Sequence, residues 1–95
     1  MSCLVGLLTI ELYFPVSQSL KEKRRLLSSL KERLKTRFNI SLAEVDFQDK
    51  WQRAQLAAAY VCNDGRRIES TFAHILDVLR ADPRMELISH EVTFR

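Results

Sequence analysis

The sequence predicts a two-layer α+β domain whose four strands and two helices follow the order β-α-β-β-α-β. Three observations support this prediction: alternating apolar segments at both ends of the chain, two helical periodicities that each follow a capping residue, and two alternating strands around a short polar turn. Each β-α-β unit needs a right-handed crossover, so both helices lie on one face of the sheet. The expected order of the antiparallel strands is 4-1-3-2.

The first strand is expected at residues 3–14, which are rich in apolar, β-branched and aromatic residues and stop at Pro15. Alternate residues from Leu4 to Phe14 share one face. Gly6 lies on that face, and we expect its missing side chain to permit close approach of the helices.

A helix should follow, because Ser19 and Glu22 form a capping box. Its apolar stripe recurs at helical spacing through to Arg37 or Phe38. The stripe consists of Leu20, Leu27, Leu30, Leu34 and Phe38. Lys23 interrupts this stripe near the start of the helix, where a leucine would be expected.

Residues 40–47 and 52–62 alternate as two strands around the turn QDK. A hairpin closed around Asp49–Lys50 predicts four facing pairs: Val45 with Ala54, Ala43 with Leu56, Asp46 with Arg53, and Glu44 with Gln55. The polar members would then lie on the face away from the helices, with a salt bridge between Asp46 and Arg53. The alternative interpretation is a partner-binding patch of Glu44, Asp46, Trp51 and Arg53, because an exposed tryptophan beside arginine is typical of interfaces.

The second helix follows the segment CNDG, in which Asn63 or Asp64 can act as the N-cap, and ends near ADP. Its apolar face consists of Ile68, Phe72, Ile75, Leu76 and Leu79. Residues 86–94 form the last alternating strand. Together these elements predict a single ferredoxin-like domain over residues 1–95.

Composition supports a globular domain, with 46% hydrophobic and 28% charged residues. The start of the chain lacks a basic region before its apolar run, and that run is too short to span a membrane. Cys3 and Cys62 match no metal or redox spacing and are expected to be buried free thiols. These features predict a soluble cytoplasmic protein.

Residues 19–38 carry eight of the fifteen lysines and arginines but only two of the twelve acidic residues. The basic residues Lys21, Arg24, Lys31 and Lys35 fall along one flank of the predicted helix, with Arg25 just beyond; Arg33 and Arg37 lie on the opposite flank. A solvated face whose long stems shield the core would explain them. However, few acids are available for pairing, and positioned cations can hold phosphates. We therefore expect a polyanion-binding surface, to which Lys23 is added as a candidate.

The open face of the sheet offers a different interpretation. It lacks the central aromatic residues on which RNA bases stack, since its third strand shows Arg53, Gln55, Ala57, Ala59 and Val61. Small apolar side chains there favour self-association. The alternative function is thus an oligomeric or ligand-sensing domain. No catalytic constellation, metal spacing or cofactor motif is present in the sequence.

Two long motifs resemble the YlxP family, small bacterial proteins classed as a domain of unknown function. They are S-L-K-x-K-R in SLKEKRRLL and A-E-V-D-x-x-D-x-W-Q-R-A in SLAEVDFQDKWQRAQLA. The resemblance implies a ferredoxin-like fold and no enzymatic activity. Genes of the family often neighbour those for transcription elongation, translation initiation and ribosome maturation, which implies a role near RNA or the ribosome. The motif residues in this chain are Ser19, Leu20, Lys21, Lys23, Arg24, Glu44, Asp46, Asp49, Trp51, Gln52 and Arg53. Cys62 stands where a serine is more usual.

Overall fold

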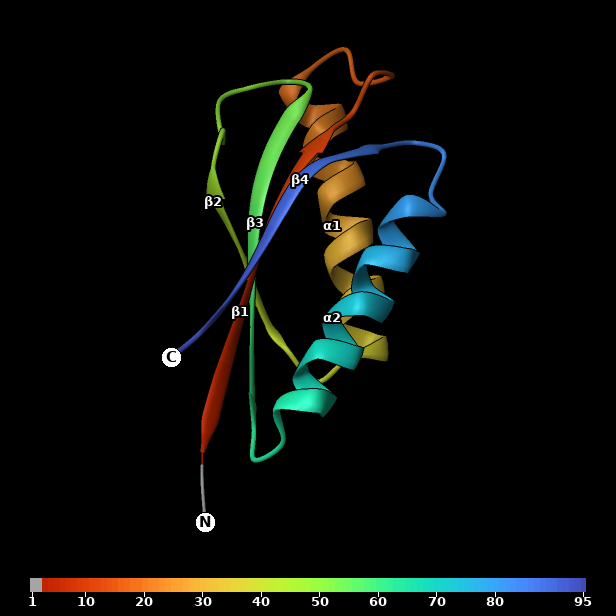
Figure 1. Cartoon of the computed structure of the whole chain (residues 1–95). Helices are drawn as coiled ribbons and strands as arrows, with labels where there is room; N and C mark the ends of the chain where they lie inside the picture. Colours follow the sequence, from red (N-terminus) through yellow and green to blue (C-terminus); the bar gives the residue numbers. More distant parts are fainter. Residues whose placement is uncertain (1–2) are drawn as a thin grey trace.

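The computed structural model describes residues 3–95 as one layer of four strands covered on one face by two helices (Figure 1). The elements are β1 (Leu4–Tyr13), α1 (Leu20–Arg37), β2 (Ser41–Asp46), β3 (Arg53–Cys62), α2 (Gly65–Arg80) and β4 (Glu86–Phe94). The sheet is antiparallel with the order β2-β3-β1-β4. The predicted ferredoxin-like topology is therefore confirmed.

β1 is a central strand, paired with β3 on one side and β4 on the other. Its alternate residues from Gly6 to Phe14 are buried beneath the helices, as the two-residue period predicted. Gly6 is required by the packing of α2, because an added Cβ would lie 2.3 Å from Ile68 Cγ2 and 3.0 Å from Phe72 Cε2.

Both helices begin at capping residues. The Ser19 hydroxyl accepts the Glu22 N–H, which is one half of the predicted capping box, and a Glu22 carboxylate oxygen accepts the N–H of Gln18, one residue before the cap, at 2.8 Å. Asp64 caps α2 by accepting the Arg66 N–H. The core is formed by the sheet face and both apolar helix stripes; its fully shielded members include Leu8, Ile10, Phe14, Leu30, Leu34, Leu56, Ile68, Ile75 and Leu79.

The β2–β3 hairpin differs from its predicted register. Glu44 lies opposite Leu56 and Asp46 opposite Gln55, with an irregularity between Glu44 and Asp46. The hairpin was expected to pair Ala43 with Leu56 and Asp46 with Arg53, so the register was wrong by one residue before this irregularity and by two residues after it. An extra residue in one strand reverses which face the following side chains occupy.

The two cysteines also depart from expectation. Cys3 precedes β1 and is exposed, and Cys62 at the end of β3 is only half-buried; both are free thiols. The prediction that both are buried was wrong because each lies at the margin of the sheet, beyond full cover by a helix. Among residues 3–95, neither helix combines the length and apolar character needed to cross a membrane.

Candidate polyanion-binding surface

One flank of α1 presents the cations that the sequence singled out. Lys21, Arg24, Arg25 and Lys35 are exposed, and Lys31 is half-buried. Within residues 3–95 none of these five side chains takes part in an ion pair. Glu22, the nearest acid at the helix start, is occupied by the N–H of Gln18. We call these five residues the basic flank; its positive charge is not neutralised within the described fold.

Lys23 does not belong to this flank. Its side chain is fully buried, and the ammonium donates to the carbonyl oxygens of Phe47 at 2.6 Å and Arg53 at 3.1 Å. A carboxylate oxygen of Glu44 lies 3.2 Å away. The two carbonyls take two of the three ammonium protons, and the Glu44 carboxylate forms an ion pair with the ammonium. Lys23 therefore joins α1 to the β2–β3 hairpin and is removed from the polyanion-binding candidates.

Glu44 also has a structural position. It lies opposite the buried Leu56 and faces the helices, so it is absent from the open sheet face on which it was predicted. Its side chain is only 16% exposed. The Oε2 atom has no hydrogen-bond partner with good geometry among the described residues, and the Lys23 ammonium supplies the compensating charge. Glu44 and Asp46 therefore lie in different environments, the first beside Lys23 and the second at the turn.

Arg53 forms its ion pair across the sheet with Glu11 of β1, through both Nε and a terminal nitrogen. The predicted partner, Asp46, instead accepts the N–H of Phe47 at 2.7 Å. This contact supports a turn in which Phe47 has φ 64°, a left-handed conformation uncommon for an aromatic residue. The Arg53 guanidinium lies 4.2 Å from the Phe47 ring centroid, within cation–π range.

Trp51 is the exposed part of the same hairpin end. It is 57% exposed and lines a shallow hollow of about 330 Å³ together with Tyr13, Lys50, Gln52 and Arg53. The neighbouring Gln52 amide donates to the carbonyls of Pro15 at 3.2 Å and Ser17 at 3.1 Å, which fixes the loop before α1 against the hairpin. The connection between β2 and β3, which contains Trp51 in the sequence, and the start of α1 therefore lie at the same end of the molecule (Figure 1).

The most strongly perturbed titratable group is one that sequence reasoning missed. Asp82, after α2, is buried and accepts hydrogen bonds from Arg84 and Arg33. The side-chain hydrogen bonds from Arg84 hold the pKa of the Asp82 carboxyl well below its usual range, against the opposing effect of burial. The only local signal was the segment ADPR, which indicated a helix end. Within residues 3–95 no three His, Cys, Asp or Glu side chains gather as metal ligands.

Comparison with known proteins places this arrangement in a family. Residues 5–92 match the family described as "Protein of unknown function (DUF503)". The chain belongs to this family. The chain is also 30% identical over 83 residues to the uncharacterised protein YlxP of Bacillus subtilis (strain 168), covering 87% of this chain and 90% of that protein.

The family assignment confirms the resemblance drawn from the two sequence motifs and brings no established activity with it. Among solved structures, the de novo designed protein Foldit4 has a TM-score of 0.52 at 18% identity, covering 99% of this chain and 97% of that one. A dimeric ferredoxin-like protein from an uncultured marine organism has a TM-score of 0.48 at 12% identity, covering 99% and 96% respectively. The likeness to Foldit4 supports the fold of this DUF503 member.

Proposed function

We propose that this DUF503 protein is a non-enzymatic cytoplasmic accessory protein that binds structured RNA or a ribosomal particle through the basic flank of α1. The observation that carries the proposal is the absence of ion pairs for these cations among residues 3–95, although the same chain pairs Lys23, Arg33, Arg53 and Arg84 with acids. Cations held on a rigid helix and left unneutralised can replace the counterions around phosphates.

Trp51 gives the proposed surface a second kind of contact. More than half of this large side chain is exposed beside Lys50 and Tyr13. Exposed aromatic residues near cations are typical anchors for a partner, whether a protein or an unpaired base. Gln52 and Lys23 join the hairpin to α1 and to the loop before it, so the hairpin end that carries Trp51 is anchored near the start of the basic flank.

Co-sedimentation with ribosomal particles over a salt series tests the proposal. Binding should weaken steeply with salt, with a logarithmic slope of about 0.7 to 0.9 per phosphate neutralised. The triple variant Lys21→Glu, Arg24→Glu, Lys31→Glu should lose binding while its free energy of unfolding stays within about 1 kcal/mol of the parent protein.

A matched control separates the surface from the net charge. Arg66→Glu, Arg67→Glu, Arg80→Glu changes the total charge by the same amount on exposed positions of α2. This variant should retain most of the binding. If the two triple variants bind equally well or equally poorly, the basic flank is not the binding surface.

The open sheet face favours a second candidate function, self-association as an interaction or ligand-sensing domain. Val61 is 61% exposed there, and Val5, Leu7, Ala57 and Ala59 remain half-buried without a covering layer within the described fold. Two copies packed through these side chains would remove apolar surface from water. Sedimentation equilibrium tests this candidate: Val61→Lys should shift an oligomer to monomer, and a parent protein that is strictly monomeric excludes it.

A further inference from the structure

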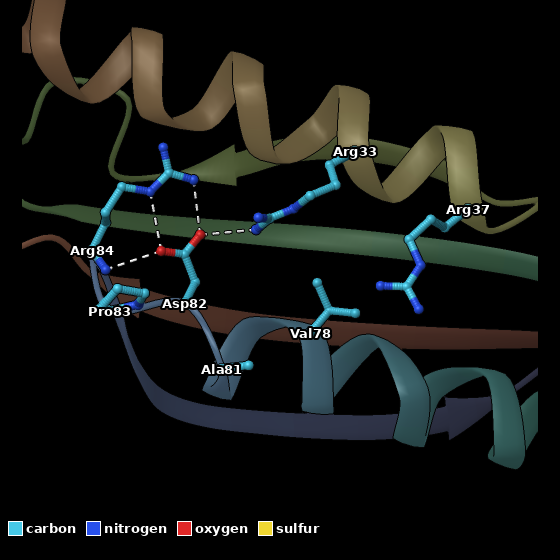
Figure 2. Close-up of a pocket in the computed structure, with 7 residues that line it drawn as sticks. All are labelled: Arg33, Arg37, Val78, Ala81, Asp82, Pro83 and Arg84. Carbon is cyan, nitrogen blue, oxygen red and sulfur yellow. Dashed lines mark hydrogen bonds and ion pairs between the residues drawn. The ribbon is translucent and has the colours of Figure 1, made fainter.

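A groove lies between the C-terminal half of α1 and the turn that follows α2. Its volume is about 370 Å³, and its lining includes Arg33, Arg37, Val78, Asp82 and Arg84. Figure 2 shows that Arg33 and Arg37 extend from α1 toward α2, while Arg84 approaches from the turn before β4. The groove is thus an open one lined by side chains from three parts of the chain, and its size is in the lower range for sites of small ligands.

Asp82 organises two of the arginines. One carboxylate oxygen accepts the backbone N–H and Nε–H of Arg84, both at 3.0 Å, and the other accepts terminal nitrogens of Arg84 and Arg33, both at 2.8 Å. This fork geometry fixes the plane of the Arg84 guanidinium before any ligand arrives, and a single hydrogen bond anchors one terminal nitrogen of Arg33. Both Asp82 oxygens thus accept hydrogen bonds from arginines and hold these side chains in place. We call this arrangement the Asp82 brace.

Several donors remain available after these bonds are formed. A guanidinium carries five N–H groups, and Asp82 takes one from Arg33 and two from Arg84. Arg33 Nε is buried without a hydrogen-bond partner among the described residues. Arg37 lines the groove and forms no ion pair within residues 3–95. Its guanidinium carbon lies 5.5 Å from the centroid of the Phe38 ring, which is a cation–π contact.

The charge of the groove favours an anion. Three arginines contribute three positive charges and Asp82 removes one. The C-terminal ends of α1 and α2 lie nearby, and each contributes about half a negative charge. The three arginines, Asp82 and the two helix ends together leave an excess of about one positive charge beside the groove.

We propose that this groove binds the phosphate group of a small molecule, with Arg33, Arg37 and Arg84 as its ligands. Arginine forks match phosphate oxygens in pairs, and a tetrahedral dianion can accept from three guanidinium groups that approach from different elements. A planar monoanionic carboxylate would use only part of this donor set. The site is separate from the basic flank, which occupies the other side of α1.

Side-chain Nε–Hε NMR spectra test this proposal with inorganic phosphate added at constant ionic strength and pH 7.5. The Arg33, Arg37 and Arg84 signals should shift together and saturate. Arg37→Gln should weaken binding about tenfold, the loss expected for a charge-assisted hydrogen bond. Arg37 is the residue to change because its removal leaves the Asp82 brace intact. Arg67→Gln, the same substitution at an exposed position of α2 outside both proposed surfaces, should leave binding within about twofold.

Nucleoside probes identify the part of the ligand that is recognised. Adenosine monophosphate should bind and adenosine should not. Tighter binding of the monophosphate than of inorganic phosphate would mean that the groove also holds the esterified group. Equal binding of the two would mean that the groove holds the phosphate alone. Shifts that never saturate, or equal losses in Arg37→Gln and Arg67→Gln, would overturn the site. The Lys21, Arg24, Lys31 triple variant leaves the groove unchanged, so the RNA proposal and this one fail separately.

Discussion

Replacing Lys23 by methionine should lower the free energy of unfolding by about 3 kcal/mol. Methionine fills a similar length but cannot donate to the Phe47 and Arg53 carbonyls, and it leaves Glu44 as an unpaired carboxylate that is only 16% exposed. Removing one partner of a buried ion pair costs roughly 3 to 5 kcal/mol. We expect a loss at the lower end of this range, because the apolar side chain avoids the desolvation of an ammonium and the hairpin end can admit water.

Urea unfolding followed by far-UV circular dichroism measures this loss. A domain of 95 residues has a stability of about 5 to 14 kcal/mol, so the variant should still fold. The melting temperature should fall by roughly 12 to 24 °C, since about 4 to 8 °C corresponds to 1 kcal/mol in a domain of this size.

The double variant Lys23→Met, Glu44→Gln provides the control. It removes the orphaned charge as well as the ammonium, and it should recover about 1 kcal/mol relative to the single variant. A single variant within 0.5 kcal/mol of the parent, or a double variant no more stable than the single one, would refute the structural role of Lys23; the 0.5 kcal/mol limit is about the size of an ordinary surface effect.

Three further predictions concern separate parts of the fold. Because Arg84 hydrogen bonds lower the pKa of Asp82, the ionised carboxylate stabilises the fold fully above about pH 4, and this stabilisation is lost as the pH falls further. In Asp82→Asn the urea midpoint should therefore decrease less steeply with falling pH than in the parent protein. Equal pH dependence of the two midpoints would contradict this. Gly6→Ala should cost about 1 to 3 kcal/mol by overpacking against Ile68, measured by thermal unfolding. Trp51→Ala should leave stability within about 0.5 kcal/mol while weakening ribosomal co-sedimentation.

The elements of the fold could be predicted because each one carries a local signal. The two-residue period of β1 and the capping box at Ser19 are readable from neighbouring residues alone. The topology followed from the order of elements and the handedness of crossovers. Gly6 could be assigned a packing role because it interrupts the buried face of a central strand, and the close approach of Ile68 confirms it.

The hairpin register could not be predicted in the same way. An irregularity between Glu44 and Asp46 is invisible in an alternating pattern, since either phase of a short edge strand looks acceptable. The shift moves Glu44 beneath the helices, where it meets Lys23 from 21 residues earlier in the chain. The lysine inside the apolar stripe was the one available hint that a buried acceptor existed.

The Arg33–Asp82 contact was inaccessible for a related reason. The two residues are 49 positions apart, and their meeting depends on how the end of α2 lies beside α1. Sequence spacing placed Arg33 and Arg37 on the flank opposite the basic flank, and the structure agrees, since both line the groove beside the end of α2. The spacing carries no information about Arg84, which approaches from a different connection.

The residues of the two family motifs fall into two groups: those whose side chains make hydrogen bonds or ion pairs within the described fold, and those whose side chains make none. Lys23, Glu44 and Gln52 join α1 and its preceding loop to the hairpin. Ser19 caps α1, Asp46 accepts the Phe47 N–H in the turn, and Arg53 pairs with Glu11 of β1. Lys21, Arg24, Asp49 and Trp51 make none among residues 3–95. A motif that served the fold alone would not explain these four residues at the surface. Gln52 donates to the loop before α1 and Lys23 reaches the hairpin from α1, so the structural residues of the motifs set the geometry in which the exposed residues can meet a partner.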